Sequence, residues 1–353
     1  MTNSSASKTN NTTINIQHWS DTQLAELGLG RSSSCQALSG DASFRKYFRL
    51  TVDESHYIAV FAPPETEKNA EFLAIAQLLA DQGINVPQVL AVDLEQGYFL
   101  QSDLGDTLLL GELNDQSVEH WYGKALTILS QLQQLKPSAD LLAYSAAQMR
   151  EDLERFPEWF VEGLLGYKMS GQERGLFDTF CQLLIDRALQ QPQVVTHYDY
   201  QSRNLMVTDS FELAVIDFQD TLIAPMTYDL VSLLRDCYIK WPLTSTRHWA
   251  LGFAQQARDA GYLHESATDE TFLEWFDSMS LQRHVRVLGT FGRLFLRDNK
   301  PGYLSDIPLV CKYIEEVASA HSEFSQFAHW FAATLLPVAQ QQTWYNAASK
   351  TDS

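Results

Sequence analysis

The feature that most constrains this chain is a run of polar residues set between short apolar stretches at residues 196–220. The segment 196–206 reads THYDYQSRNLM, and the segment 215–220 reads VIDFQD. Asp199 therefore stands five residues before Asn204, and Asp217 stands thirteen residues after it. Transfer of a phosphoryl group from a nucleotide needs such a set: a carboxylate beside the acceptor hydroxyl, and an Asn and an Asp that hold Mg²⁺ on the phosphates.

The spacing and the surrounding sequence support this interpretation together. His-x-Asp, four further residues, Asn and then Asp-Phe is the order of the catalytic and metal-binding loops of kinases. Apolar residues at 194–195, 205–207 and 213–216 predict three short strands around the polar residues, so the polar side chains stand on loops of a rigid scaffold. The alternative is that Asp199 and Asn204 only cap turns. That would explain either residue alone but not the ordered set.

Composition limits the class of protein. The chain has 353 residues, 45% of them hydrophobic, and a net charge of −19, which fits a soluble globular protein and disfavours nucleic acid and anionic membranes as partners. There is no apolar run long enough to span a membrane and no apolar stretch typical of a signal peptide. The four scattered cysteines read as reduced thiols, so we expect a cytoplasmic protein. Residues 1–15, rich in Ser, Thr and Asn, predict a disordered tail.

Periodicity predicts an α+β chain of two parts. A helix over 17–30, strands over 44–52, 57–61, 89–92 and 98–101, and a helix over 67–81 predict a small, mostly antiparallel N-lobe at residues 16–102. Helical patterns dominate residues 103–353, which we expect to form a catalytic and substrate-binding C-lobe. A nucleotide is expected in the cleft between the lobes.

Candidate phosphate contacts lie in the N-lobe. A turn of small residues lets backbone N–H groups approach phosphates, which makes Gly40 and Ser43 candidates, although a plain hairpin turn is the alternative. Kinases also use a lysine of the third strand paired to a helix Glu, but 57–61 contains no basic residue. We expect Arg45 or Lys46 to supply the charge, with Glu71 as the acidic partner. The alternative for all three is a solvated surface position.

The acceptor side gives two further signals. Few residues separate Asp217 from Asp229, which leaves no room for the activation segment of a protein kinase and favours a small-molecule acceptor. Arg283, Arg286 and two more arginines, at 293 and 297, would fall within about 80° of one another on a helix. Such a face could contact a substrate carboxylate or phosphate through bidentate bonds, or it could pair with acidic residues of the chain.

Longer stretches carry a resemblance to a known family. They are GDASFRKYFRL (40–50), FAPPE (61–65), NVPQVLAVDLEQGYFLQSDLG (85–105), RFPEWF (155–160), HYDYQSRNLM (197–206), IDFQDTLIAPMTYDLVSLLRDCY (216–238) and RLFLRD (293–298). The chain resembles the aminoglycoside phosphotransferase/choline kinase superfamily. Within it, the FPEW and VSLLRDCY stretches are similar to the bacterial anomeric N-acetylmuramate/N-acetylglucosamine kinases of cell-wall recycling.

The resemblance implies a bilobal protein-kinase-like fold, ATP and Mg²⁺, and phosphorylation of the C1 hydroxyl of an N-acetyl amino sugar in peptidoglycan recycling. Asp199 would be the catalytic base, Asn204 and Asp217 the metal ligands, and Gln219 and Asp220 contacts to the sugar or a metal-bound water. His197 and Asp229 would support the loop.

Two alternatives remain open at this point. The chain could be another small-molecule kinase of the superfamily, acting on an aminoglycoside, a choline-like amino alcohol or another metabolite. It could also be a non-catalytic nucleotide-binding scaffold, which only the missing third-strand lysine supports.

Overall fold

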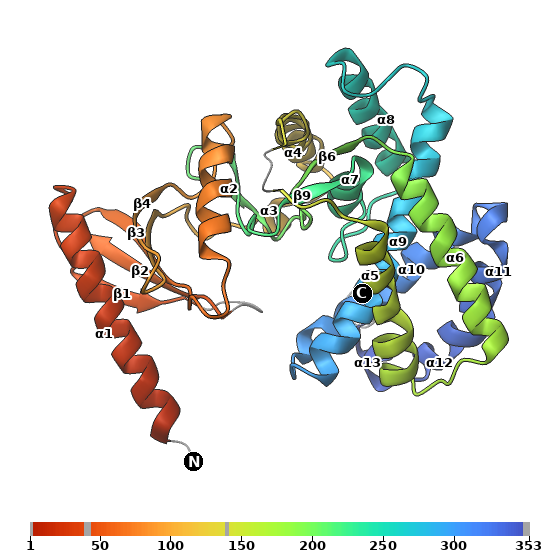
Figure 1. The fold of residues 1–353 in the computed structure, drawn as a ribbon, viewed down its shortest axis with the longest axis horizontal. Helices are drawn as coiled ribbons and strands as arrows, with labels where there is room; N and C mark the ends of the chain where they lie inside the picture. Colours follow the sequence, from red (N-terminus) through yellow and green to blue (C-terminus); the bar gives the residue numbers. More distant parts are fainter. Residues whose placement is uncertain (1–2, 39–43, 138–140, 349–353) are drawn as a thin grey trace. The chain divides into compact units, whose positions relative to one another are not determined.

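The computed structural model of the chain describes residues 3–38, 44–137 and 141–348. The backbone divides into two compact units (Figure 1). The first consists of Met1–Lys124 and Arg203–Asp220, and the second of Ala125–Ser202 and Thr221–Ser353. Within the described ranges, no helix combines the length and the apolar character needed to cross a membrane.

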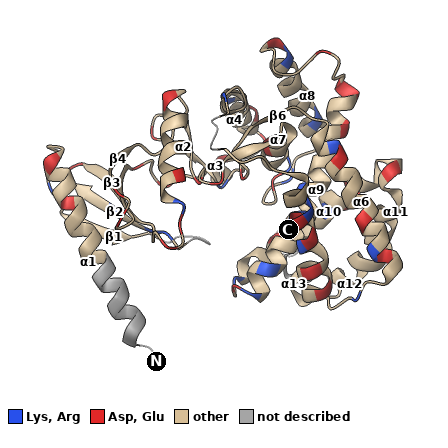
Figure 2. Ribbon diagram, in the orientation of Figure 1, with Lys and Arg blue, Asp and Glu red and all other residues tan. Residues whose placement is uncertain are grey.

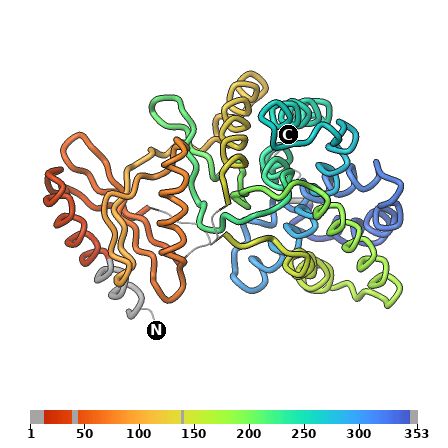
Figure 3. Tube along the Cα trace, turned by 45° about the horizontal axis from the view of Figure 1, so that its top comes forward, coloured from red at the N-terminus to blue at the C-terminus, as the bar shows by residue number. Residues whose placement is uncertain are grey.

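The chain passes between the two units three times, as Figure 3 traces. It leaves the first unit along α4 (Val118–Gln133), returns for residues 203–220, and then continues in the second. The returning segment belongs to the first unit because Val207 N donates to the Thr107 carbonyl and Val215 N to the Asn85 carbonyl, both at 2.8 Å. The boundary expected after residue 102 therefore falls inside the first unit.

The first unit is built on a five-stranded antiparallel sheet of order β1-β2-β3-β5-β4. Its strands are β1 (Ser34–Ala37), β2 (Lys46–Val52), β3 (Ser55–Phe61), β4 (Val89–Asp93) and β5 (Tyr98–Ser102). The unit also holds α3 (Leu109–Glu112) and the hairpin of β7 (Leu205–Val207) with β8 (Leu213–Val215). The alternation of apolar residues predicts β2, β3, β4 and β5, but no strand is predicted at β1.

Two helices cover opposite faces of this sheet (Figure 1). Ile16 and Leu24 of α1 (Asn3–Glu26) are buried with Phe48 and Leu100 on one face. Side chains alternate along a strand, so Phe99 points to the other face, where its ring lies 5.5 Å from that of Phe72. Phe72 belongs to α2 (Asn69–Asp81), the helix predicted over 67–81.

The first helix differs from the prediction. The sequence predicts a disordered tail at residues 1–15 before a helix over 17–30, whereas α1 begins at Asn3 and ends at Glu26. Residues 3–15 contain neither Gly nor Pro, so nothing in them interrupts a helix that continues N-terminally from the buried residues at 16–24. Where a helix continues only through its backbone hydrogen bonds, the sequence shows no apolar periodicity that would mark its first residue.

The second unit is mostly helical and surrounds one long helix, α9 (Asp269–Leu296). Its other helices are α5 (Ala146–Arg155), η1 (Phe156–Leu164), α6 (Gly171–Leu189), α7 (Thr227–Leu234), α8 (Leu243–Asp259), η2 (Pro301–Asp306), α10 (Ile307–Ser319), η3 (Ser322–Phe324), α11 (Ser325–Trp330), η4 (Phe331–Leu335), α12 (Leu336–Gln340) and α13 (Thr343–Ala348). A small antiparallel pair, β6 (Gln193–Thr196) with β9 (Leu222–Pro225), carries the start of the 197–202 loop.

Two glycines let α9 approach η1, a π-helix, at backbone distance. A Cβ atom on Gly289 would lie 2.3 Å from the carbonyl carbon of Arg155, and one on Gly292 would lie 2.7 Å from the carbonyl oxygen of Trp159. Real Cβ atoms do not come so close to backbone, so any side chain at Gly289 forces the two helices apart. This contact fixes the position of Arg155 beside α9.

We predict that Gly289→Ala destabilises the protein by about 1–3 kcal/mol or more, because the added methyl has only rigid backbone to displace. The matched control is Gly252→Ala, an exposed glycine within α8 where an added Cβ would meet no atom within 4 Å. This change should be neutral or stabilising by up to about 1 kcal/mol. Urea unfolding measures both. Equal effects of the two changes would contradict the close contact.

A buried histidine of α9 is held neutral by its partners. His284 Nε2 lies 3.0 Å from the Arg235 carbonyl, which can only accept, so Nε2 carries the proton and Nδ1 faces the Ser280 hydroxyl at 3.1 Å. Its ring stacks on Tyr313 at 4.7 Å. Burial, followed by the charge of Arg283, lowers the pKa of His284 to about 3 from its ordinary 6.5.

This shift makes stability depend on pH in a defined window. In the unfolded chain His284 gains a proton near pH 6.5, whereas in the folded chain it does so only near pH 3. The stability that comes from burying the neutral imidazole is therefore fully present above pH 6.5 and is lost as the pH falls toward 3. We expect the melting temperature to fall more steeply between pH 7.5 and 5.5 in wild type than in His284→Gln. The control, His321→Gln, should show the opposite trend, because the hydrogen bond to Asp277 raises the pKa of His321. Parallel curves would refute the assignment.

Candidate active site

The predicted metal ligands lie together at the open end of one hairpin in the first unit. Strands β7 and β8 pair from Leu205↔Val215 to Val207↔Leu213. Beyond this pairing, Ile216 N donates to the Asn204 carbonyl at 3.0 Å. Asn204 precedes β7 and Asp217 follows β8 after one residue, so this bond brings the two predicted ligands close together.

The backbone at Asp217 separates an exposed carboxylate from a buried ring. Asp217 has φ +64°, a left-handed conformation that costs a residue with a side chain about 1–3 kcal/mol. The next residue, Phe218, is fully buried and stacks on Phe72 of α2 with ring centroids 4.9 Å apart. The exposed Asp217 carboxylate accepts a hydrogen bond from Gln219 Nε2 at 2.8 Å. The burial of Phe218 thus stabilises the strained backbone conformation of Asp217.

The donor set fits Mg²⁺. An amide oxygen from Asn204 and a carboxylate from Asp217 are hard oxygen ligands, and Mg²⁺ in nucleotide sites takes one or two protein carboxylates and completes its shell with phosphates and water. Over the part of the chain that the structure describes, no group of three or more His, Cys, Asp or Glu could hold a metal alone. A site made of Asn204 and Asp217 therefore needs the nucleotide to complete it.

Arg45 is a buried basic residue of the same unit. It is only 7% exposed, its Nε donates to Glu67 at 2.9 Å, and its guanidinium lies 4.6 Å from the ring of Phe72. Burial raises the pKa of Tyr47, with Arg45 opposing and Asp217 adding to the shift. Arg45 and Asp217 therefore both lie beside Tyr47.

The other predicted phosphate contacts have different surroundings. Lys46 and Glu71 are exposed, and Glu67 in the loop before α2, not Glu71, pairs with Arg45. Gly40 and Ser43 lie outside the described residues. Asp220, predicted to reach the sugar or a metal-bound water, forms an exposed ion pair with Lys68 at 2.9 Å. The sequence gives no signal for Glu67 as this partner: it is the first residue of the helix predicted over 67–81, whereas α2 begins at Asn69.

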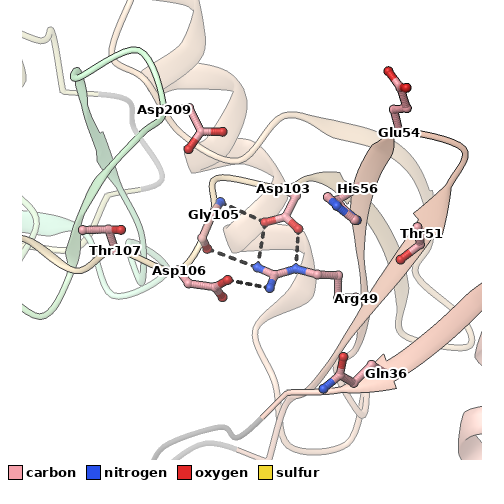
Figure 4. Close-up of a pocket in the computed structure, with 10 residues that line it drawn as sticks. All are labelled: Gln36, Arg49, Thr51, Glu54, His56, Asp103, Gly105, Asp106, Thr107 and Asp209. Atoms are coloured by element: carbon pink, nitrogen blue, oxygen red, sulfur yellow. Dashed lines mark hydrogen bonds and ion pairs between the residues drawn. The ribbon is translucent and has the colours of Figure 1, made fainter.

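A cavity of about 630 Å³ lies in the first unit beside the segment that follows β5 (Figure 4). Arg49 donates to both oxygens of Asp103 at 2.5 and 3.1 Å, to Asp106 at 2.8 Å and to the Gly105 carbonyl at 3.2 Å. These bonds pair the positive charge of Arg49 with the carboxylates of Asp103 and Asp106. Glu54 and Asp209 add two more carboxylates to the walls and His56 a single imidazole, so the cavity suits a neutral or cationic group better than a phosphate.

In the second unit, a buried carboxylate supports the catalytic loop. Asp229 accepts the backbone N–H of His197 at 2.6 Å and of Tyr198 at 3.0 Å. Burial raises the pKa of Asp229 to about 7, and the two N–H bonds oppose that shift. His197 is also buried, and its Nδ1 accepts the N–H of Asp199 at 3.3 Å. These are the contacts that the predicted support roles of His197 and Asp229 require.

Asp199 presents an accessible carboxylate backed by a buried cation. Its side chain is 46% exposed, whereas that of Arg283 is 1% exposed. Arg283 Nη2 lies 3.3 Å from Asp199 Oδ1 and 3.4 Å from Gln201 Oε1. The ion pair therefore holds the accessible Asp199 carboxylate beside a buried guanidinium.

Arg286 lies on the other side of the same loop. Its guanidinium lies 4.4 Å from the ring centre of Tyr198, and it donates to Tyr228 Oη at 2.8 Å. Tyr198 has φ +78° and donates through its hydroxyl to Asp152 at 2.6 Å. Asp152, which the sequence analysis did not select, also lies 3.2 Å from Arg286 Nε. In the sequence Asp152 is a single acidic residue on an amphipathic helix, and such a position does not indicate a functional role.

The chain is similar to known proteins in sequence and in fold. A family model described as phosphotransferase enzyme family matches residues 34–268. An N-acetylmuramate/N-acetylglucosamine kinase from Pseudomonas putida is 37% identical over 320 residues, 89% of this chain and 94% of the relative. The ethanolamine kinase of Plasmodium vivax has a TM-score of 0.60 at 11% identity, covering 83% of this chain and 84% of that one. An aminoglycoside phosphotransferase solved with streptomycin and ATP has a TM-score of 0.54 at 12% identity, covering 92% and 98%.

At such low identities the solved structures bear on the fold alone. They confirm the kinase-like class predicted from the sequence: an antiparallel five-stranded sheet in the N-terminal part, followed by a mostly helical C-terminal part.

Proposed function

Because this chain belongs to the phosphotransferase enzyme family, we propose that it transfers the γ-phosphoryl group of ATP to the anomeric hydroxyl of N-acetylmuramate, N-acetylglucosamine or both. The observation that carries the choice of substrate is the likeness, over most of the chain, to kinases named for these two sugars. The product, a sugar 1-phosphate, would re-enter peptidoglycan synthesis in the cytoplasm. The net charge of −19 supports partners that are small molecules rather than nucleic acid or membrane.

The first unit supplies the groups that bind the nucleotide. Asn204 and Asp217 would hold Mg²⁺, which when bound neutralises negative charge on the phosphate oxygens. Arg45, fixed by Glu67 and Phe72, takes the place of the absent third-strand lysine as a cation near these ligands. Its burial in the ion pair keeps the guanidinium in one position, so little rotational freedom is lost when phosphate binds.

The second unit supplies the groups that act on the acceptor. Asp199 accepts a hydrogen bond from the C1 hydroxyl, orients its oxygen toward the γ-phosphorus, and takes the proton as that oxygen attacks. The new bond joins the sugar oxygen to phosphorus, and the bond to the bridging oxygen breaks to release ADP. Arg283, which is buried beside Asp199, fixes the position of that carboxylate.

We predict that Asp199→Asn lowers kcat by about 10²–10⁴-fold while nucleotide binding is retained, because the amide cannot accept the proton. Asp259→Asn, a change at the exposed end of α8, serves as the control and should keep wild-type turnover. Steady-state ADP release measures kcat, and titration calorimetry measures ATP binding. Near-normal turnover in Asp199→Asn would remove this residue from the mechanism.

We predict that Asp217→Asn abolishes Mg²⁺-dependent binding of ATP, because the carboxylate contributes the charge that balances the metal. Wild type in excess EDTA should bind ATP as weakly as the variant does in Mg²⁺. Calorimetry with and without Mg²⁺ tests both. If the variant kept a strong dependence of ATP affinity on Mg²⁺, Asp217 would not be a metal ligand.

The substrate assignment is tested with a panel of acceptors. ATP consumption in Mg²⁺ is measured with N-acetylmuramate, N-acetylglucosamine, glucose, choline and kanamycin, followed by phosphorus NMR of the product. We expect turnover with one or both N-acetyl sugars and a phosphorus doublet from coupling to the anomeric proton. Turnover only with choline or kanamycin would replace the substrate class and keep the reaction.

A further inference from the structure

One face of α9 gathers arginines in a strongly acidic protein. Acidic segments recur on helices of both units in Figure 2, in keeping with the net charge of −19. Against this background, Arg286 and Arg293 share a face of α9, and Arg155 lies beside α9 because Gly289 contacts its backbone. Burial, followed by the charges of Arg155 and Arg297, lowers the pKa of Arg293. Arg155, Arg286 and Arg297 therefore each lie close enough to Arg293 to act on its charge.

The acids nearby do not balance this cluster. Asp152 pairs with Arg155 at 2.8 Å and with Arg286 at 3.2 Å, and its carboxylate also accepts the hydroxyls of Tyr144 and Tyr198. Arg297 is 56% exposed and pairs with its neighbour Asp298 at 2.7 Å. Arg293 forms no ion pair with any side chain of the ranges that the structure describes. The single carboxylate of Asp152 is thus shared by Arg155 and Arg286, and Arg293 has no ion-pair partner among the described side chains.

Polar atoms with no hydrogen-bond partner line the same face. Arg286 Nε, Thr290 Oγ1 and Arg293 Nε are each buried without one, since the contact of Arg286 Nε with Asp152 has ion-pair distance but not hydrogen-bond geometry. The residues are spaced i, i+4 and i+7, which places them on one side of a helix. A buried polar group without a hydrogen bond destabilises the folded chain, so three in a row point to a ligand that supplies the missing bonds.

The face extends from the catalytic loop. Helical side chains lean toward the N-terminus of their helix, so Arg293 leans over Thr290 toward Arg286. Arg286 in turn covers the ring of Tyr198, the residue before Asp199. From the side of Arg286, Thr290 and Arg293 follow about one and two turns further along the same face of α9.

We infer that Arg293 and Thr290, with Arg155 beside them, form a subsite for the lactyl carboxylate of N-acetylmuramate. This inference rests on the proposed function and names what selects between its two sugars. N-acetylmuramate differs from N-acetylglucosamine by the lactyl ether on O3, which carries the only charge of the sugar. Guanidinium groups bind carboxylates through paired, charge-assisted hydrogen bonds, and Thr290 Oγ1 supplies one more donor.

The test compares both sugars on the full-length chain carrying Arg293→Met, with Arg297→Met as the matched control on the same helix end. Loss of a charge-assisted bond should raise KM for N-acetylmuramate about 10- to 100-fold and leave kcat/KM for N-acetylglucosamine within about twofold. Arg293→Lys keeps the charge and should give an intermediate KM. Thr290→Val should show a smaller loss confined to N-acetylmuramate. Arg297→Met should match wild type with both sugars, and melting temperatures confirm that the variants are folded.

Each contrary result has a distinct meaning. Equal losses with both sugars in Arg293→Met, or no loss with either, would overturn the subsite and leave the proposed function standing. Wild type that turns over N-acetylglucosamine and not N-acetylmuramate would do the same. If wild type turned over neither sugar but phosphorylated another acceptor, the proposed function and the subsite would both fall.

Discussion

The geometry of the catalytic loop depends on three buried carboxylates of the helical unit. Asp229 accepts two backbone N–H groups, Asp236 accepts the N–H and hydroxyl of Ser202 at 2.9 and 2.5 Å, and Asp152 accepts the hydroxyl of Tyr198. A buried charge is tolerated only where hydrogen bonds replace its hydration. The loop provides those bonds, so the acids and the loop fix each other. Asp199 is thereby left as the accessible carboxylate of the loop.

Backbone strain is placed where the function needs a side chain turned away from the core. Tyr198 and Asp217 both have positive φ, which side chains disfavour. At Asp217 the compensation is the stacking of buried Phe218 on Phe72, and at Tyr198 it is the stacking of its ring on Tyr228 at 5.1 Å. In each case an aromatic contact offsets the strain of about 1–3 kcal/mol, and the neighbouring carboxylate gains a fixed direction.

The sequence predicts the elements and residues that follow from short-range patterns. It does not predict the pairings that depend on tertiary contacts. The spacing of the catalytic loop singled out its polar residues, and apolar periodicity located α2 and every sheet strand except β1. The partner of Arg45 was assigned to Glu71 because a helix Glu fits the pattern, yet Glu67 in a loop makes the pair. Asp152 stayed hidden for the same reason, since its role comes from packing of α5 against α9. Continuation of α1 to Asn3 likewise left no apolar signal.

The arginine face shows how structure divides a set that a helical projection treats as uniform. The projection places Arg283, Arg286, Arg293 and Arg297 within one arc, but their surroundings differ along the axis. Arg283 is buried against Asp199, Arg286 is shared between Asp152 and the Tyr198 ring, and Arg297 pairs with an exposed neighbour. Arg293 forms no ion pair with the described side chains, and its Nε is buried without a hydrogen bond, as is Thr290 Oγ1. A partly buried cation that forms no ion pair with the described side chains is explained by a ligand that carries a negative charge.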